Sequence, residues 1–220
     1  MGNPLEDADY EPVHEEGERW VRGDRQADHY QKFLEKSAEN PLAAHGEGTL
    51  NKVLKPEDMP WELSPQGLLK HMLNEDMAEE FDYPGMGADL YQQVIPPGSR
   101  SGKHRHRGEE IVIVLEGEGY DLHWDAQLEV VGELDREKPQ WVFDEEPKRF
   151  EWEAGDAIYV PVNTIHQHHN ASQEKPARFI SAQARAFTNL GFGYEDLEQF
   201  DVAPEFEEGL PDEVDIPEYE

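Results

Sequence analysis

The sequence predicts an all-β fold. Short apolar segments, each about as long as a strand, are separated by turns that contain glycine or proline. Residues 88–95 are followed by Pro96-Pro97-Gly98, and residues 111–115 are followed by Gly117-Glu118-Gly119. Glycine and proline mark turns because they adopt or fix backbone angles that regular elements avoid. Residues 157–160 and 178–187 continue the pattern, so we expect a sheet structure built from consecutive strands.

The residues before these strands are polar and contain one helical pattern. Residues 1–23 are rich in charge and predict a disordered or loosely docked acidic arm. Between Asp24 and Ala38 the apolar residues recur at helical spacing, Asp24 is a candidate N-cap, and Pro41 lies beyond the end. We therefore expect a helix there, on the outside of the sheet structure or at a subunit contact.

Three segments carry further expectations about strands. Residues 67–74 follow a turn-forming stretch, Ser64-Pro65-Gln66-Gly67, and are interpreted as a strand, although their leucines and methionines would also tolerate a helix. Ile111–Leu115 is a continuous apolar run and is interpreted as a buried strand. The segments 141–143 and 150–152 are expected to pair with each other around a turn at residues 145–147. Their aromatic side chains either line a pocket for an aromatic ligand or fill one end of the fold.

The chain is strongly acidic, with 50 acidic and 19 basic residues and a net charge of −31. Residues 1–24 carry −6 and residues 195–220 carry −12, so the rest of the chain carries −13. Such a field repels nucleic acids and anionic membranes, and we expect neither as a partner. One interpretation is adaptation to concentrated intracellular salt, as in a halophilic microbe, because salt screens the self-repulsion. The alternative is an ordinary acidic protein with acidic tails.

The composition also sets expectations about compartment and chemistry. The chain has no cysteine, which excludes disulfides, thiol nucleophiles and cysteine-ligated clusters. No stretch approaches the ~20 apolar residues of a transmembrane helix. The first twenty residues are acidic and lack the apolar core of a secretory signal. A cytoplasmic protein is the expectation.

Three histidines and one glutamate stand out in the strand region. His104 and His106 are two residues apart, so in a strand they point to the same side, about 6–7 Å apart along the chain. Glu110 follows four residues later with the same parity, and His166 comes from a different strand. Three neutral imidazoles and one carboxylate suit a divalent first-row metal, and open positions on that metal would make the site catalytic rather than structural.

The spacing around these four residues resembles the paired motifs of the cupin superfamily. The first motif is matched at every position from Gly98 to Gly117, and the second from Gly155 to Asn170, except that Asn163 stands where the family usually has glycine. Asparagine tolerates a positive φ angle, so the departure is mild. The resemblance covers roughly residues 90–187. It implies that His104, His106, Glu110 and His166 are metal ligands.

The resemblance also implies an architecture. We expect a single cupin domain, a double-stranded β-helix or jelly-roll-like antiparallel barrel, with an N-terminal helix and acidic tails. The expected divisions are the acidic arm at residues 1–23, the helix and extra strands at residues 24–88, the barrel at residues 89–188, and the acidic C-terminal tail at residues 189–220. A homodimer is expected because cupins commonly dimerise through barrel edges.

Cupins with this ligand set resemble metal-dependent dioxygenases, among other activities. The expectation is an iron(II) enzyme that acts with O2 on a phenolic or enolisable small molecule, with Glu110 also able to act as a base. Manganese, nickel and zinc are alternative metals. One alternative function is a redox-neutral isomerase, lyase or decarboxylase. Another is a barrel that binds a small molecule without turnover.

Several other polar residues have two interpretations each. A group of cations between Ser99 and Arg107 either attracts an anionic substrate at the rim, or neutralises the acidic surface locally or pairs in a dimer, and we favour the second interpretation. Arg105 has the opposite parity to His104 and His106 and is expected to lie outside the pocket. His168 has the parity to face inward near the metal, but the motif assigns the ligand to His166. The sequence gives no definite role to His71, His123, His168 or His169.

Overall fold

The computed structural model describes residues 55–56, 59–73, 88–131, 138–184, 197–211 and 214. These residues form β-strands and one short helix, which confirms the all-β prediction. The expected helix between Asp24 and Ala38 lies outside the described residues. The elements are β1 (Trp61–Ser64), β2 (Gly67–Leu73), β3 (Ala88–Ile95), β4 (His104–His106), β5 (Glu110–Glu116), β6 (Glu118–Trp124), β7 (Ala126–Val131), β8 (Lys138–Phe143), β9 (Lys148–Glu153), β10 (Ala157–Val160), β11 (Ile165–Asn170), β12 (Ala177–Ala184), β13 (Leu197–Gln199) and α5 (Pro204–Glu208).

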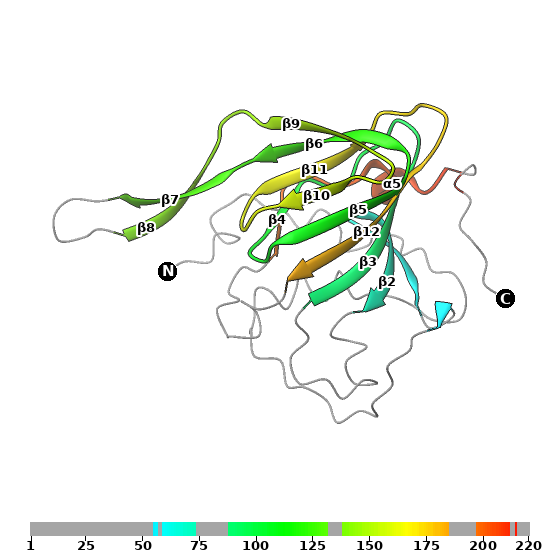
Figure 1. Cartoon of the computed structure of the whole chain (residues 1–220), viewed down its shortest axis with the longest axis horizontal. Helices are drawn as coiled ribbons and strands as arrows, with labels where there is room; N and C mark the ends of the chain where they lie inside the picture. The colour runs from blue at the N-terminus through cyan, green and yellow to red at the C-terminus, as the bar shows by residue number, and fades with distance from the viewer. Residues whose placement is uncertain are drawn as a thin grey trace, which may run out of the picture.

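Two antiparallel sheets face each other and form the barrel (Figure 1). The six-stranded sheet has the order β1-β2-β3-β12-β5-β10, and the five-stranded sheet has the order β13-β4-β11-β6-β9. An apolar cluster fills one part of the interior between them and draws side chains from both sheets. Its members are Ile95, Val112, Val114, Trp152, Ile158, Ala177 and Phe179. Burial of each large member contributes about 1.5–3 kcal/mol to folding.

The strand predicted at residues 67–74 is confirmed as β2, and the turn before it joins β2 to β1 in a hairpin. The short strand β1 was not expected, because only four residues of mixed character form it. Its position is explained by packing on the outer side of the sheet. Trp61 and Leu63 form a cluster with Phe206 of α5. The C-terminal segment therefore covers the outer face of β1, β2 and β3.

The prediction that Ile111–Leu115 is buried on both sides is wrong. Val112 and Val114 face the core and are at most 2% exposed, whereas Ile111, Ile113 and Leu115 are 42–49% exposed. The segment is an ordinary antiparallel strand with alternating faces, and the alternation was hidden because its outward residues are apolar as well. The outer face of β5 is therefore an unusual apolar surface.

The predicted pairing of residues 141–143 with residues 150–152 is also wrong. Residues 141–143 lie in β8, which pairs with β7, and residues 150–152 lie in β9, which pairs with β6. Together these strands form one long hairpin that bends between its two halves. At the bend, Lys148 Nζ lies 2.7 Å from Asp125 Oδ2 and 2.9 Å from Asp144 Oδ2. We call the β7–β8 half the arm, because it projects away from the barrel (Figure 1).

In the part of the chain that the structure describes, no helix has the length and apolar character needed to span a membrane.

Candidate metal centre

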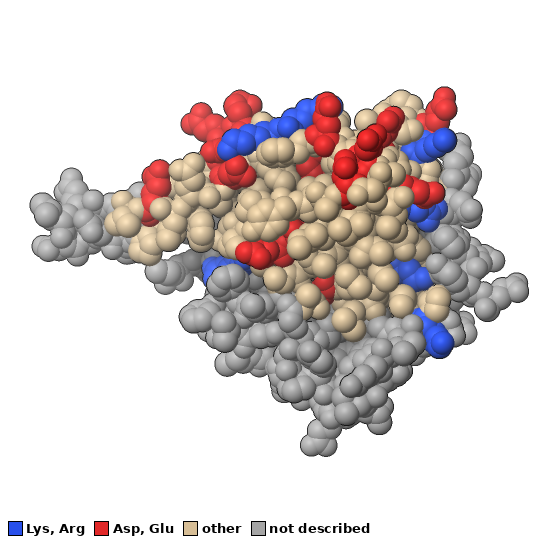
Figure 2. Space-filling model, viewed as in Figure 1, with Lys and Arg blue, Asp and Glu red and all other residues tan. Residues whose placement is uncertain are grey.

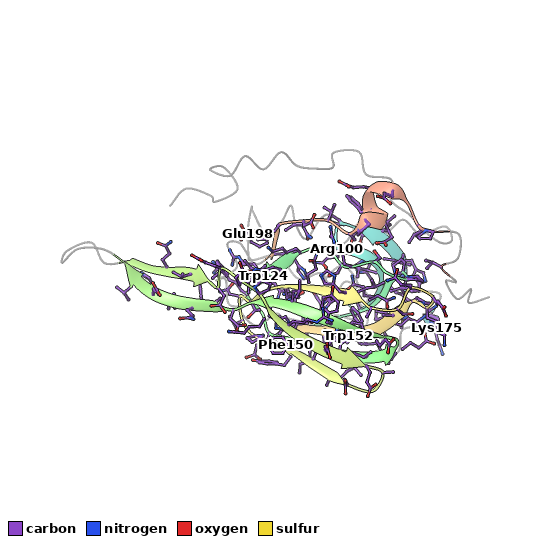
Figure 3. The ribbon with its side chains drawn as sticks, turned by 90° about the horizontal axis from the view of Figure 1, so that it is seen from above. Arg100, Trp124, Phe150, Trp152, Lys175 and Glu198 are labelled. Atoms are coloured by element: carbon purple, nitrogen blue, oxygen red, sulfur yellow. The ribbon has the colours of Figure 1, made fainter. Side chains whose placement is uncertain are left out.

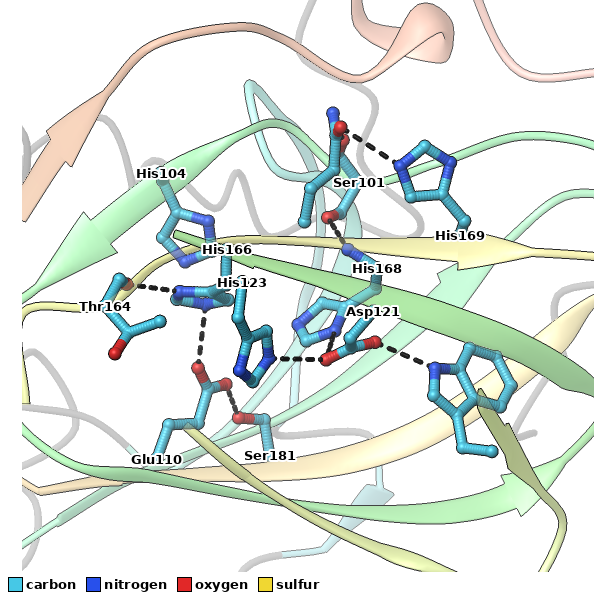
Figure 4. A network of polar contacts seen from close by, with 12 residues as sticks. Ser101, His104, Glu110, Asp121, His123, Thr164, His166, His168, His169 and Ser181 are labelled. Carbon is cyan, nitrogen blue, oxygen red and sulfur yellow. Dashed lines mark hydrogen bonds and ion pairs between the residues drawn. The ribbon is translucent and has the colours of Figure 1, made fainter. Parts of the chain in front are cut away.

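The four residues singled out by the motifs come together between the two sheets. Figure 4 shows three of them, His104, Glu110 and His166. One potential ligand atom from each of His104, His106, Glu110 and His166 lies within 4.8 Å of all the others. The histidines belong to β4 and β11 of the five-stranded sheet, and Glu110 begins β5 of the six-stranded sheet. The centre therefore bridges the two sheets at the middle of the barrel.

Strand register explains why the imidazoles converge. His104 lies directly opposite His166 in the antiparallel pair β4–β11. Directly opposed residues point to the same face of a sheet, and His106 shares that face by its two-residue spacing. The ring centroids of His104 and His166 are 4.1 Å apart, and those of His106 and His166 are 5.0 Å apart. All three side chains are at most 2% exposed.

Each imidazole is held through the same ring nitrogen. Nδ1 of His104 lies 3.2 Å from the Gly102 carbonyl oxygen, and Nδ1 of His106 lies 2.7 Å from that of Gly108. Nδ1 of His166 lies 2.9 Å from the Thr164 carbonyl oxygen. A carbonyl only accepts, so each Nδ1 donates its proton to the backbone, and in a neutral ring Nε2 is the nitrogen left for a metal. This is the arrangement by which backbone carbonyls orient metal-binding histidines.

The Nε2 atoms and the Glu110 carboxylate are placed as a set of donors to a cation. Nε2 of His106 is 2.9 Å from Glu110 Oε2, and Nε2 of His166 is 3.2 Å from the same oxygen. The Nε2 atom of His166 is buried without a well-aligned hydrogen bond. Lone pairs that face an anionic oxygen in a buried site are favourable when a cation lies between them. The donor set therefore fits a divalent metal.

The pKa values agree with that interpretation. Burial, together with the neighbouring His166 and His106, holds the pKa of His104 well below its ordinary value. Burial lowers the pKa of His166 to about 4, although Glu110 partly opposes it. Burial alone would raise the pKa of Glu110, but the neighbouring His106 and His166 hold it well below the usual range. Neutral imidazoles and an ionised carboxylate are the forms that bind metals.

The other oxygen of Glu110 is held by two residues that the sequence did not indicate. The Tyr91 hydroxyl donates to Oε1 at 2.6 Å, and the Ser181 hydroxyl donates to the same atom. These residues come from β3 and β12, which are neighbours in the six-stranded sheet. Oε2 is therefore the oxygen that remains for a metal. No spacing signal in the sequence connects Tyr91 or Ser181 to Glu110.

A second buried polar cluster lies beside the first (Figure 4). Asp121, which is fully buried, accepts hydrogen bonds from Trp152 Nε1 at 2.8 Å and His168 Nδ1 at 2.9 Å. His123 Nε2 lies 3.3 Å from the same carboxylate. Burial would raise the pKa of Asp121, but the charge of His168 and the hydrogen bonds from His123 and His168 lower it strongly. Burial lowers the pKa of His168, but the charge of Asp121 and its hydrogen bond outweigh that effect, so the pKa of His168 is raised.

The remaining histidines named by the sequence lie away from the four-residue centre. His71 Nε2 is 2.7 Å from Glu62 Oε2 in a buried pair on β1 and β2. His169 faces the opposite side of β11 from His166 and stacks on the Tyr120 ring at 4.7 Å. The interior parity expected for His168 is confirmed, since it is 1% exposed.

The cations around the first motif pair with acidic residues of the C-terminal segment. Arg100 Nη1 lies 2.9 Å from Asp201, and Arg105 Nε lies 2.6 Å from Glu198. For these two residues the expectation of local neutralisation is confirmed. Arg105 lies outside the centre as expected, and its Nη1 donates to the side chain of Asn163 at 2.9 Å. Asn163 itself has a φ of 61°, which explains how it stands in a position that favours glycine.

Comparison with known proteins gives a family match. The family described as auxin binding protein matches residues 67–203, which is more than half of the chain. An uncharacterised protein of Methanocaldococcus jannaschii is 33% identical over 89 residues, which are 40% of this chain and 54% of that protein. The chain thus spans about half the length of the curated relative it matches.

Solved structures with a similar fold include two from Thermotoga maritima. A cupin-like protein is 18% identical with a TM-score of 0.40, covering 61% of this chain and 76% of the other. A predicted oxalate decarboxylase is 20% identical with a TM-score of 0.41, covering 60% of this chain and 97% of the other. The family match over residues 67–203 includes both cupin motifs and all four converging residues. The chain therefore belongs to the auxin binding protein family, and its domain is of the cupin type.

Proposed function

We propose that this protein is a metal-dependent enzyme that uses iron(II) and O2 to oxidise a phenolic or enolisable small molecule. The observation that carries the proposal is the convergence of three imidazoles and one carboxylate in a site that is at most 2% exposed. Four protein ligands leave two positions of an octahedral metal for a substrate and O2. Bound iron(II) would supply Lewis acidity toward the substrate hydroxyl and would activate O2.

Glu110 has two tasks in this proposal. Its low pKa keeps the carboxylate ionised at neutral pH, which is the form that would hold a metal. A bound metal would lower the pKa of the substrate hydroxyl, so that this weak base could accept its proton. Tyr91 and Ser181 donate hydrogen bonds to Oε1. These donors hold the carboxylate in place. They also stabilise its ionised form, which makes it a weaker base.

The barrel supplies a dry surrounding for this chemistry. His168, 5.4 Å from His166 between ring centroids, packs at 5.0 Å against Phe179 of the apolar core. Exclusion of water strengthens electrostatic interactions and protects reactive species. Because no further cofactor motif was found in the sequence, the substrate is expected to supply all electrons, and both oxygen atoms are expected to enter the product.

The family description favours a second candidate function, which is binding of a small molecule without turnover. In that case the metal would serve as an anchor for a chelating ligand, and the same four residues would hold it. The redox-neutral alternative, an isomerase, lyase or decarboxylase, uses the same centre without O2.

An oxygen-uptake experiment separates these candidates. Protein loaded with iron(II) is given a panel of phenolic and enolisable compounds, with and without air, and without NADH. The proposal expects O2 consumption and products that carry both atoms of isotopically labelled O2. Equal turnover without air would assign the protein to the redox-neutral class. Binding of a compound to the metal-loaded protein without any turnover would assign it to the binding class.

Two histidine variants test the centre itself. His166→Ala removes one of the four ligands, so elemental analysis should find that most of the metal is lost. His169→Ala is the matched control, because His169 lies on the same strand and faces away from the centre. Full metal content in both variants would show that the four residues are not the metal site. Glu110→Gln should keep the fold and lose most of the turnover.

A further inference from the structure

The described surface contains two apolar sheet faces that the metal centre does not use. The first, which we call the barrel face, is the outer side of β5 and β10. It contains Ile111, Ile113, Leu115, Ala157 and Tyr159, of which the four large side chains are 42–54% exposed. Strand register makes the face continuous, because Tyr159 lies opposite Ile111 and Ala157 lies opposite Ile113. Figure 2 shows a broad uncharged area over β5, β10 and β12, with charged side chains gathered mainly along its upper edge.

The second surface, which we call the arm face, is one side of the β7–β8 hairpin. Its three directly opposed pairs are all apolar, namely Ala126 with Phe143, Leu128 with Trp141, and Val130 with Pro139. Leu128 is 58% exposed, Val130 is 66% exposed and Trp141 is 37% exposed. The opposite side of the hairpin is mainly polar, since it pairs Gln127 with Val142 and Glu129 with Gln140.

Most of the apolar face of the arm is not buried within the described structure. Phe143, at its base, has the Arg105 guanidinium over its ring, 5.6 Å from the centroid. A two-stranded ribbon is marginally stable in water and needs a packing partner. Within the described residues, the main packing partner of each arm strand is the other one. Figure 3 shows Trp124 at the base of the arm, and from there the hairpin leads away from the barrel. The barrel face of the same molecule is therefore out of its reach.

The six-stranded sheet itself indicates that its outer face is built to be covered. Over β1, β2 and β3 the same outer side packs against α5, where Trp61 is 3% exposed and Phe206 is 7% exposed. Over β5 and β10 no described element takes that role, although the side chains are equally apolar. A sheet face of this kind resembles an interface more than a surface that meets water.

We propose that a second copy of the chain covers both surfaces, so that the arm face of each copy packs on the barrel face of the other. The two faces are both apolar β surfaces, and none of their residues is charged in a chain whose residues are 31% charged. Two copies that each carry −31 can meet there with no carboxylate among the residues of either face, although Glu109, just before β5, interacts with the Tyr159 hydroxyl. A basic partner would instead need acidic residues on the faces, which have none.

The exposed side chains of the two faces would form the apolar core of the contact. Each copy contributes the seven large exposed side chains of its two faces, at 37–66% exposure. Interfaces with a core of this kind, at about 800 Å² per partner, are the standard size for a stable complex. In a two-fold pair each contact occurs twice, which closes the assembly at two copies. The homodimer expected from the sequence stays a prediction, and these faces give it a definite surface.

Engineered cysteines test the arrangement directly, because the chain has no cysteine of its own. Leu128→Cys and Ile113→Cys are prepared separately, mixed in equal amounts and oxidised mildly. The proposal expects a mixed disulfide between the two variants, identified by mass spectrometry. Gln127→Cys is the matched control for the arm, because it lies on the opposite side of the same strand and should not cross-link to Ile113→Cys.

The mass of the particle in solution completes the test. Light scattering should give twice the chain mass of 25.3 kDa for the natural protein, and a single chain for Leu128→Glu or Val130→Glu. Metal content, which the arm does not contribute to, checks that these variants fold. A monomeric natural protein at both low and high salt would overturn the proposal. A dimer that cross-links through Gln127→Cys, or only between identical variants, would overturn the arrangement.

Discussion

At the scale of single residues, the two oxygens of Glu110 have different partners. Oε2 faces the Nε2 atoms of His106 and His166, whereas Oε1 receives the hydroxyl groups of Tyr91 and Ser181. A carboxylate that is fixed in this way binds a metal through one oxygen, since rotation to a two-oxygen mode would break both hydroxyl contacts. The hydroxyl groups therefore position Glu110 from neighbouring strands of its own sheet.

The first prediction concerns Tyr91. Tyr91→Phe removes one donor to Oε1, and we expect metal affinity to fall by about tenfold, because partners that orient a ligand are worth roughly 10–100-fold in affinity. The measurement is a metal titration against a chelator. Tyr120→Phe is the matched control, because that ring stacks on His169 on the outer side of the sheet. Unchanged affinity in Tyr91→Phe would mean that Ser181 is sufficient to hold the carboxylate.

The sequence could predict the four converging residues but not their supports. His104, His106 and Glu110 share strand parity within seven residues, and His166 lies in a matching second motif. Tyr91 and Ser181 reach Glu110 because β3, β12 and β5 are neighbours in the sheet. That order depends on which distant strands pair, and a single sequence carries no local signal for it.

At the scale of elements, Asp121 links three strands of the five-stranded sheet. It lies on β6 and accepts hydrogen bonds from Trp152 of β9 and His168 of β11. The cluster stands directly beside the metal centre, with the His166 and His168 rings 5.4 Å apart. A buried carboxylate with these donors fixes the relative position of the strands that carry the centre.

The second prediction concerns the removal of this charge. Asp121→Asn should destabilise the protein by roughly 3–5 kcal/mol, because it leaves the partner of a buried charge pair uncompensated. The pKa of His168 is raised in the folded protein, so its contribution to stability is complete below about pH 6.5 and is lost as the pH rises through the folded value. In the variant this loss should flatten or reverse, because burial alone lowers the pKa of a histidine.

Chemical denaturation at several pH values between 6 and 9 measures both effects. Asp125→Asn is the control, since Asp125 is a partly exposed carboxylate that pairs with Lys148 at the bend of the long hairpin. Its loss should cost no more than about 1 kcal/mol. A pH profile of Asp121→Asn that runs parallel to the natural protein would refute the assignment of the titration to this pair.

The elements that the sequence misassigned share a physical cause. Ile111, Ile113 and Leu115 are apolar and yet face outward, so hydrophobicity alone could not distinguish a buried strand from one with an exposed apolar face. Residues 141–143 and 150–152 are close in sequence and both suit strands, but each pairs with an earlier strand. The pairing follows from the long hairpin, in which β6 pairs with β9 and β7 pairs with β8.

At the scale of the whole molecule, charge is the dominant property. Residues 25–194 alone carry −13, so repulsion among carboxylates opposes the compact state. The third prediction is that the melting temperature rises substantially between 0.1 M and 1 M potassium chloride, as the Debye length falls from ~10 Å to ~3 Å. Chloride is preferred to sulfate, because sulfate strengthens burial in most proteins. A flat or falling dependence would leave the ordinary acidic protein as the better interpretation.

The position of β13 has a consequence for the order in which the molecule is completed during synthesis. The strand β4, which carries His104 and His106, lies between β11 and β13 in its sheet. Arg105 in the middle of β4 is tied to Glu198, 93 residues further along the chain. Until the ribosome has released β13, the strand with both histidines has one edge unpaired and one arginine without its carboxylate. A nascent chain can therefore pair β4 along one edge only until β13 has emerged, and we expect a metal bound before that point to be held less firmly.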